Sequence, residues 1–498
     1  MELNFAKKDV ACLDAVLREV QNSEQTQTIQ IPDGLPDVGK VLAAWGQCIQ
    51  RGKEWRGGSI GFTGGMMVWV LYAPEDGGRE ICIDGWIPFQ MQWELPGDTP
   101  EGDIRMKCLT RFVDARSVSP RKLLVRAGMG VLAEAWAPKA WSFSQPAGET
   151  RDVELLQNTY PVRLPKEAGE KTFLIDEELT LPDTLPQPDK LVYYRMEPVI
   201  TERKVLSGKL VFRGNSRLHI LYRSGEGSLQ SWDTELSFSQ FAELREEHST
   251  DAQAELLPGV TSLEAEISDE GRLRLKAGAV AQYLISDLEP LTVVEDAYSP
   301  GRETELQRES LEVPALLESR RETLSGEQTL GGETGTAVDV VLLPDFPRET
   351  PTETGVELEV PLTAQVLFYG EDGALRSGTA RWEACQSLPS SQDSRITALP
   401  GPGEIQVIPS PGGFQLRSET ALDCTASASR GIPMVTGVTL GDVKQKDPAR
   451  PSLILRRAGA GGLWDIAKSA GSTVEAIRQA NALQSEPAPG QMLLIPVP

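Results

Sequence analysis

Most of the chain alternates short runs of apolar and polar residues, separated by turns rich in glycine, proline and acidic residues. A period of two with frequent turn residues is typical of β-structure, so we expect a mainly β protein with short strands. The longest apolar run, Met66 to Ala73, has the length of a strand, whereas a membrane helix needs about 20 residues. Between Asp9 and Gln21 the spacing is helical and predicts one amphipathic helix, with apolar residues Val10, Leu13, Val16, Leu17 and Val20.

Three segments of the chain resemble one another. They read VWVLYAPEDGG, LHILYRSGEGS and AQVLFYGEDGA, and their turn glycines are Gly77, Gly227 and Gly373. These glycines lie 150 and then 146 residues apart. Each segment predicts a strand, an acidic turn in which glycine takes a positive φ, and a second strand. The chain therefore repeats a unit of ordinary domain size.

Two more pairs of segments repeat at the first offset. LLVRAG from Leu123 matches LRLKAG from Leu273, which we interpret as short strands that end in an Ala-Gly turn. The Pro-Asp-rich stretch IPDGLPDV has a relative in LPDTLPQPD. The third copy is more divergent, because its strand from Phe414 falls out of register. We expect three related β-rich domains over residues 1–160, 161–306 and 307–445, then a smaller module over residues 450–498.

Composition indicates where these domains are joined. Residues 160–171 and 294–310 are polar and contain proline and glycine, as linkers do. Residues 323–336 are rich in Gly, Thr and Glu and have little to bury, so we expect a mobile segment there.

From Pro451 onward the pattern changes. SLILRR predicts a short strand, and the apolar residues of LWDIAKSAG have helical spacing up to a stop at Gly471. STVEAIRQANAL starts with Ser472 and Glu475 in the pattern of a capping box, and Asn481 stands at its end. PAPGQMLLIPVP predicts a turn and a strand. The order is β-α-α-β, with both helices expected on one face of a two-stranded sheet.

Charge and rare residue types restrict the function. The chain has 72 acidic and 49 basic residues, a net charge of −23, which disfavours binding to nucleic acid. The two histidines, His219 and His248, are too few for a Ser-His-acid triad or a His-ligated metal cluster. Its six cysteines form no CxxC pair and fit buried thiols in a reducing compartment. The N-terminus does not resemble a secretory signal, so we expect a cytoplasmic protein without metal, cofactor or membrane span.

The run LWDIAKSAGSTVEAIRQANAL with PGQMLLIP resembles the LysM module, a β-α-α-β domain best known for binding glycans that contain N-acetylglucosamine. The upstream repeats resemble the sporulation-associated SPOCS domain. The residues similar to the SPOCS pattern are Pro36-Asp37-Val38, Leu71-Tyr72 and Pro88-Phe89. SPOCS repeats followed by a terminal LysM resemble the architecture of SipL-type spore-coat morphogenesis proteins.

That resemblance implies a non-enzymatic scaffold in the mother-cell cytoplasm of an endospore-forming bacterium, at the forespore surface. Proteins of this type bind the coat basement-layer ATPase, the stage IV sporulation protein A, and help the coat to encase the forespore. The first LysM loop of the family commonly reads Gly-Asp-Thr-Leu-Trp, whereas here Leu463-Trp464 follow Ala460-Gly461-Gly462. A helix-capping acid and a hydroxyl that could face a sugar are missing, which favours a protein partner over a glycan.

We expect two loops of the LysM-like module to flank one end and form its contact surface. Trp464 is expected to pack in the core or half-buried, with an interface role as the alternative. The candidate partner- or glycan-binding residues are Gly459, Ala460, Gly461, Gly462, Trp464, Asn481, Glu486, Pro489 and Gly490.

Other chemical patterns favour structural explanations. Residues 57–61 read Gly-Gly-Ser-Ile-Gly and fit the G-x-S-x-G hydrolase motif, but a loop leads into a strand there, where the motif requires a strand before and a helix after. Acidic neighbours at 176–178 fit a solvated face better than a glycosidase pair. His219 is interpreted as a strand residue and His248 as a surface residue. We expect no catalytic residue.

Three alternatives to the scaffold stay open. A peptidoglycan-binding protein of the spore envelope would sediment with purified peptidoglycan. A cell-wall hydrolase with an unrecognised carboxylate pair would give a lytic band in a zymogram. A phage structural protein with a LysM module would be identified by its neighbouring genes.

Overall fold

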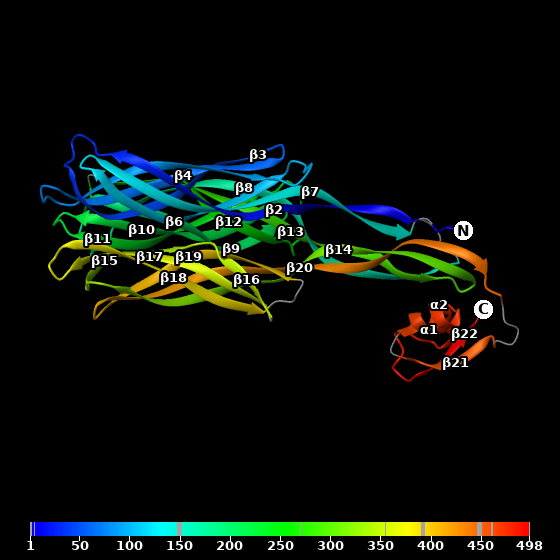
Figure 1. Cartoon of the computed structure of the whole chain (residues 1–498). Helices are drawn as coiled ribbons and strands as arrows, with labels where there is room; N and C mark the ends of the chain where they lie inside the picture. The colour runs from blue at the N-terminus through cyan, green and yellow to red at the C-terminus, as the bar shows by residue number, and fades with distance from the viewer. Residues whose placement is uncertain are drawn as a thin grey trace.

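The computed structural model describes residues 2–3, 5–146, 152–268, 270–353, 355–389, 394–445, 451–459 and 462–497. Strands make up almost all of this part of the chain, and its two helices lie near the C-terminus (Figure 1). The prediction of a mainly β protein that ends in a small β-α-α-β module is confirmed.

The first repeat contains two three-stranded antiparallel sheets with the orders β2-β7-β6 and β3-β4-β5. Its strands are β2 (Phe5–Gln30), β3 (Val38–Arg56), β4 (Ser59–Pro74), β5 (Ile81–Glu94), β6 (Asp103–Ser119) and β7 (Lys122–Pro146).

The second repeat has the same two sheets, with the orders β8-β13-β12 and β9-β10-β11. Its strands are β8 (Glu154–Leu179), β9 (Pro188–Leu206), β10 (Lys209–Ser224), β11 (Leu229–Glu243), β12 (Gln253–Ile267) and β13 (Leu273–Tyr298). Both β9 and β10 start 150 residues after β3 and β4, which agrees with the repeat found in the sequence.

The third repeat keeps this arrangement with two changes. β15 and β16 share one edge of β17, where the other repeats have one continuous strand, and the short β1 pairs with β20. The strands are β1 (Glu2–Leu3), β14 (Arg302–Gly331), β15 (Gly335–Pro344), β16 (Arg348–Thr352), β17 (Gly355–Gly370), β18 (Leu375–Pro389), β19 (Ser394–Ser410) and β20 (Gly413–Val443).

The predicted acidic turns have the expected backbone. Gly77, Gly227 and Gly373 all adopt positive φ, at 76°, 93° and 76°. Each donates its N–H to the carbonyl three residues earlier. Glycine is needed there because a Cβ is disfavoured at positive φ.

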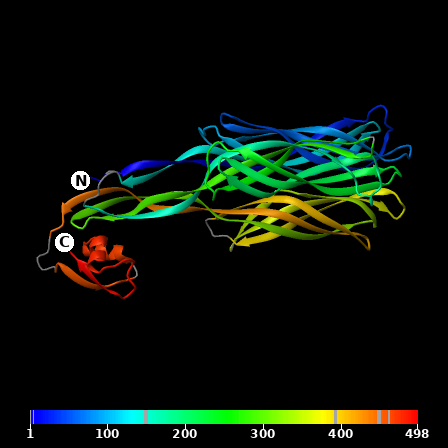
Figure 2. The same ribbon diagram turned by 180° about the vertical axis from the view of Figure 1, so that it is seen from behind.

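The strands are longer than the sequence pattern predicts. β2, β7, β8, β13, β14 and β20 each contain 25 to 31 residues. They pair as three two-stranded ribbons that continue beyond the body of the molecule as an arm (Figures 1 and 2). The ribbons bury apolar side chains against one another, including Trp141 and Leu164, and this apolar core holds the arm together.

The helix predicted between Asp9 and Gln21 is wrong, because this segment belongs to β2 and pairs with β7 along its whole length. A register shift between Ala15 and Leu17 makes Val16 the extra residue of a β-bulge. The bulge interrupts the period-two pattern and leaves apolar residues at a spacing that resembles a helix. Val16 and Leu17 both pack against the core of the first repeat.

The expected linkers are also strands. Residues 160–171 lie inside β8, and residues 294–310 run from β13 into β14. The prolines of β8 are tolerated because β8 pairs only with β13 and is an edge strand. The expected mobile segment, 323–336, covers the end of β14 and the start of β15, and Leu324 in it is buried. The division into domains at the expected positions stays a prediction.

The Ala-Gly pairs do not end strands, because β7 and β13 continue through them. Instead, Gly128 and Gly278 each lie opposite a β-bulge, at Arg111 in β6 and at Thr261 in β12. A Cβ on Gly128 would come within 2.4 Å of the Phe112 ring. The repeated glycine therefore makes room at a repeated bulge.

β4, β10 and β17 are the central strands of one sheet in each repeat, and adjacent residues in them face two different cores. Tyr72, Tyr222 and Phe368 point into the separate cores of their own repeats. The preceding residues, Leu71, Leu221 and Leu367, all point into one shared core between the three repeats and are at most 2% exposed. Both faces of these strands are thus buried, and the three repeats form one body around this shared core.

Candidate functional site

The C-terminal module is built from β21 (Leu453–Arg457), α1 (Gly462–Ala470), α2 (Val474–Ala480) and β22 (Met492–Pro496). β21 and β22 are antiparallel, and the helices bury Leu463, Ile466 and Ile477 against them. The module lies beside the end of the arm (Figure 1).

Two loops meet at one end of the module. The Ala458 N–H donates to Gln491 O at 2.8 Å, and the Gly490 N–H donates to Ala458 O at 2.9 Å. These bonds bring Gly459 close to Gly490 and to Pro489 in the turn before it. Ala460 and Gly461 lie outside the described residues.

Glu486 replaces the helix-capping acid that the sequence of the first loop lacks. Its Oε2 accepts the N–H of Leu463 at 3.0 Å, in the first turn of α1. Arg478 donates to the other carboxylate oxygen at 3.2 Å. Gly462 has a φ of 69° and lies beside this carboxylate. The cap thus comes from the second loop, and it ties the two loops together.

Trp464 lies away from this loop end. It is half-buried, as expected, and its ring meets Tyr298 of β13 edge-on with the centroids 4.9 Å apart. Its Nε1 donates to Asp296 at 2.9 Å, and Lys468 forms an ion pair with the same oxygen at 2.6 Å. Burial opposes ionisation of Asp296, but these two donors outweigh it and hold the pKa of Asp296 below its usual value.

Tyr298 completes the contact between module and arm. Its hydroxyl donates to Ser472 O at 2.9 Å, and its ring is part of the core of the module. Sequence reasoning missed Asp296 and Tyr298, because they lie in a stretch interpreted as a linker. Their spacing of two residues, which places both side chains on one side of a strand, is the signal that could have found them.

Asn481 has a structural role in the module. Its amide nitrogen donates to Leu494 O at 2.6 Å, and its side-chain oxygen accepts the Leu494 N–H at 2.7 Å. It ends α2, as predicted. The predicted capping box is wrong, because the N-cap is Thr473, which accepts the Ala476 N–H, while the hydroxyl of Ser472 bonds to Pro496 O.

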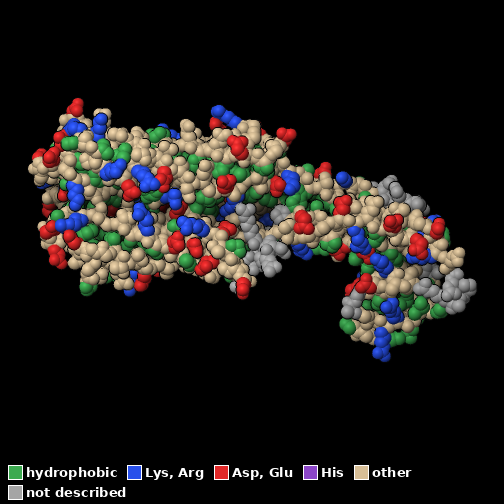
Figure 3. Space-filling view, in the orientation of Figure 1, with side chains coloured by type: hydrophobic (Ala, Val, Ile, Leu, Met, Phe, Trp, Pro, Cys, Tyr) green, Lys and Arg blue, Asp and Glu red, His purple; other side chains and the backbone are tan. Residues whose placement is uncertain are grey.

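The outer face of the small sheet exposes apolar side chains. Leu453, Leu455 and Met492 are 50%, 63% and 46% exposed. The strand register places Leu453 and Leu455 opposite Pro496 and Leu494, and Met492 opposite Arg457, so all lie on one face. Figure 3 shows hydrophobic side chains on the side of the module that β21 forms. Solvated apolar stripes of this kind mark interaction surfaces.

The hydrolase pattern at residues 57–61 forms a turn between β3 and β4. Gly57 takes a positive φ, and Ser59 donates to Arg56 O at 3.3 Å instead of to a histidine. No helix follows it, so no nucleophile elbow is present in this segment. The acidic residues at 176–178 are exposed on β8, as expected.

The two histidines serve the packing of the body. His219 lies in β10, as predicted, between Asp233 at 2.7 Å and Asp339 at 2.9 Å. The prediction that His248 is a surface residue is wrong, since its side chain is 1% exposed. It is held by Asp287 at 2.8 Å and Glu167 at 3.2 Å. In the described part of the chain no group of three His, Cys, Asp or Glu side chains is arranged to hold a metal.

Comparisons with known proteins identify two modules. A model of the SipL SPOCS domain matches residues 188–268, which run from β9 to just past β12, and a LysM model matches residues 463–496. The chain contains a SipL-type SPOCS domain and a LysM domain. Both are non-catalytic binding modules, and together they support a binding role related to the spore coat.

No curated protein and no solved structure matches the chain significantly. Among the described residues, no helix has the length and apolar character needed to cross a membrane.

Proposed function

We propose that the protein is a non-enzymatic scaffold of endospore coat assembly. In this role its LysM domain binds the coat basement-layer ATPase, of the stage IV sporulation protein A type, on the forespore surface in the mother cell. The SPOCS-like body and the arm carry the LysM domain and contact other coat proteins. This proposal uses no cofactor, metal or nucleic acid.

The apolar face of the LysM sheet carries the proposal of a protein partner. Leu453, Leu455 and Met492 expose large side chains to solvent on a sheet of only two strands. Sugars are oriented by a few placed hydrogen bonds, whereas protein interfaces bury such side chains at their centres. The described residues of the first loop, Gly459 and Gly462, offer no side-chain hydrogen-bonding group.

Charge supports the same proposal. The LysM region from Pro451 has four basic and three acidic residues, in a chain with a net charge of −23. A partner with a negatively charged surface can therefore approach this region without the repulsion expected from the chain as a whole.

The loop end, with Gly459, Gly462, Glu486, Pro489 and Gly490, is the second candidate surface of the domain. It is the surface expected to be used if the protein binds peptidoglycan, which is the alternative function. Trp464 is left out of either surface because it packs on the arm.

A binding assay with the full-length chain tests the proposal. We expect Leu455→Glu, and deletion of residues 451–498, to abolish binding to the purified coat ATPase. Gln484→Glu adds the same charge at an exposed position away from the sheet face and should bind like the wild type. Binding that survives the deletion would contradict the proposal. Sedimentation with peptidoglycan, lost on changing Glu486 but kept by Leu455→Glu, would favour the alternative.

A further inference from the structure

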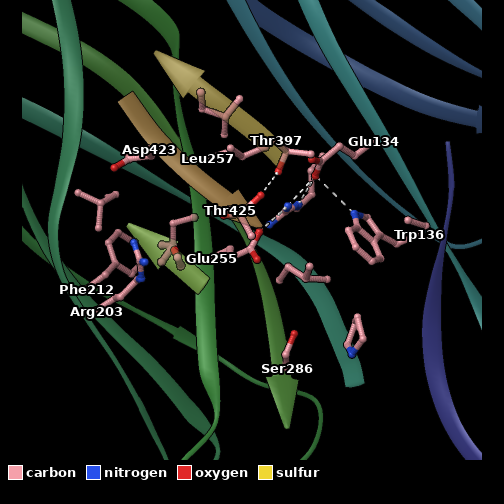
Figure 4. Close-up of a pocket in the computed structure, with 18 of the residues that line it drawn as sticks. Glu134, Trp136, Arg203, Phe212, Glu255, Leu257, Ser286, Thr397, Asp423 and Thr425 are labelled. Carbon is pink, nitrogen blue, oxygen red and sulfur yellow. Dashed lines mark hydrogen bonds and ion pairs between the residues drawn. The ribbon is translucent and has the colours of Figure 1, made fainter. Parts of the chain in front are cut away.

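A large cavity lies where the three repeats face one another, and the proposed scaffold role does not use it. Its volume is about 1230 Å³, and strands of all three repeats form its walls. β2, β6 and β7 come from the first repeat, β8 to β10, β12 and β13 from the second, and β14, β19 and β20 from the third. Figure 4 shows the labelled side chains around it, among them Glu134 and Glu255.

The lining of the cavity is basic, although the chain as a whole is strongly acidic. Five acidic side chains line the cavity, namely Asp14, Glu134, Glu202, Glu255 and Asp423. Eight basic side chains line it, namely Arg18, Arg105, Arg163, Arg203, Lys204, Arg213, Arg320 and Arg321. Such a reversal of sign concentrates anions in a cleft, because the low-dielectric walls focus the local field.

A buried arginine in the wall has an unsatisfied donor. Arg105 is 1% exposed; its Nε and Nη2 donate to Glu134 at 2.9 and 2.6 Å, and Nη2 also reaches Glu255 at 3.3 Å. Arg18 pairs with the other oxygen of Glu134 at 2.7 Å. Nη1 of Arg105 has no hydrogen-bond partner among the described residues. A buried guanidinium N–H without an acceptor is costly, so this wall of the cavity retains an unsatisfied positive donor just beneath its surface.

Two further cations at the cavity are available to a ligand. Lys204 lies opposite Val211 in the β9–β10 hairpin, and Arg213 is two residues further on, so both are on one face of the hairpin. Both side chains are exposed and neither forms an ion pair with any described residue. On this face the two cations outnumber the one carboxylate that lines the cavity, Glu202, which lies opposite Arg213.

Apolar residues provide the rest of the wall. Ile200, Val211, Leu256, Leu257 and Leu399 line the same cavity. Apolar walls with a few polar groups are the usual composition of a small-molecule site.

We propose that this cavity binds an organic anion in which a carboxylate, sulfonate or phosphate group is joined to an apolar body. The anionic group is held by Lys204 and Arg213, and the apolar body packs against the leucines of the same cavity. Since the walls come from all three repeats, such a ligand also stabilises their arrangement.

Two dyes that share an apolar body but differ in charge distinguish the contribution of the anionic group to binding from that of the apolar body. The probes are 8-anilinonaphthalene-1-sulfonate and its uncharged analogue N-phenyl-1-naphthylamine, titrated into the full-length chain and followed by fluorescence. We expect one saturable site for the sulfonate. The double variant Lys204→Glu/Arg213→Glu should weaken sulfonate binding by about tenfold or more and change binding of the neutral dye by less than about twofold. The sulfonate should raise the Tm of the wild type but not that of the variant.

A control with the same change in net charge tests whether the effect is local. Lys40→Glu/Lys122→Glu alters two exposed lysines that form no ion pair with described residues and do not line the cavity. This control should bind the sulfonate like the wild type. An equal loss in the control, an equal loss for the neutral dye, or the lack of saturable sulfonate binding would each overturn the proposal.

Discussion

One buried position carries a tyrosine in the first two repeats and a phenylalanine in the third. Tyr72 donates its hydroxyl to Pro36 O at 3.0 Å, and Tyr222 donates to Pro186 O at 2.9 Å in the same way. The corresponding residue of the third repeat is Phe368, which has no hydroxyl and meets Phe414 edge-on at 4.9 Å. The third repeat also lacks the Pro-Asp-rich stretch that supplies the acceptor in the others.

Donor and acceptor are thus both absent from the third repeat, and no buried polar group is left unsatisfied at this point. The neighbouring position behaves differently, since Leu71, Leu221 and Leu367 are leucine in all three repeats. A side chain that faces only the core of its own repeat can be substituted when its one hydrogen-bond partner is lost with it. The shared core is built from side chains of all three repeats, so the shape of a residue in it is restricted by more than its own repeat.

The largest effect is expected in the shared core. Leu221→Ala should lower the free energy of unfolding by about 2–5 kcal/mol, because it leaves a cavity at a site that is 0% exposed. Leu71→Ala and Leu367→Ala should lower the free energy of unfolding by similar amounts, although the sequence of the third repeat is divergent. Urea denaturation measures these differences. Leu288→Ala, at a position that is 44% exposed, is the control, and an equal cost there would contradict the shared core.

A tyrosine at the corresponding position of the third repeat should lower the stability of the protein. Phe368→Tyr places a hydroxyl at a buried position that lacks the proline carbonyl of the other repeats, which should cost about 2 kcal/mol. Thermal unfolding gives the difference in stability. A neutral or stabilising result would mean that the third repeat still supplies an acceptor.

The second repeat should make a contribution to the pH dependence of stability that the other two repeats do not make. His219 stands where the first repeat has Trp69 and the third has Gln365. Burial lowers its pKa, but Asp339 and Asp233 outweigh this and raise the pKa of His219 to about 10. Its ion pairs therefore stabilise the protein fully below about pH 6.5. This contribution is lost as the pH rises toward 10.

His219→Gln, which copies the third repeat, should remove this part of the pH dependence. Urea denaturation at pH 6.5 and pH 9.5 should show a loss of about 3 kcal/mol in the wild type that is absent from the variant. Parallel pH profiles for the two proteins would show that His219 is not charged in the folded state.

The smallest effect is expected for removal of the two hydroxyls. Tyr72→Phe and Tyr222→Phe should each cost about 1 kcal/mol, the usual net value of one hydrogen bond. Each should therefore be milder than Phe368→Tyr, and calorimetry of the three variants gives the order. A larger loss of stability for Tyr72→Phe or Tyr222→Phe than for Phe368→Tyr would contradict the difference proposed between the repeats.

The sequence predicts the repeats and the terminal module well, because both depend on local patterns. The acidic turns require glycine at positive φ, and Gly77 and its two counterparts have it. Strand length was missed, because proline and polar residues at 160–171 are typical of linkers and are equally compatible with an edge strand in a ribbon. The bulge at Val16 is a further local irregularity, and it makes a strand resemble a helix.

The meeting of the two LysM loops was predicted, whereas the exposed apolar face of the LysM sheet was not. The two loops were expected to meet, and Ala458 and Gly490 join them. The contact of Trp464 with Asp296 depends on residues 168 positions apart, and no periodicity along the chain reports a contact of that kind. The shared core was missed for the same reason, since burial on both faces of a strand is a property of the assembled repeats.

The arm determines how far apart the two ends of the protein are held. β14 has 30 residues and rises about 3.3 Å per residue, so it runs for about 100 Å through arm and body, with Val313 in the core of the arm and Leu324 in the core of the third repeat. Because its three twisted ribbons share one apolar core, the arm resists bending in a way that a flexible tether does not. The arm therefore keeps the LysM domain at a fixed place beyond the body (Figure 1).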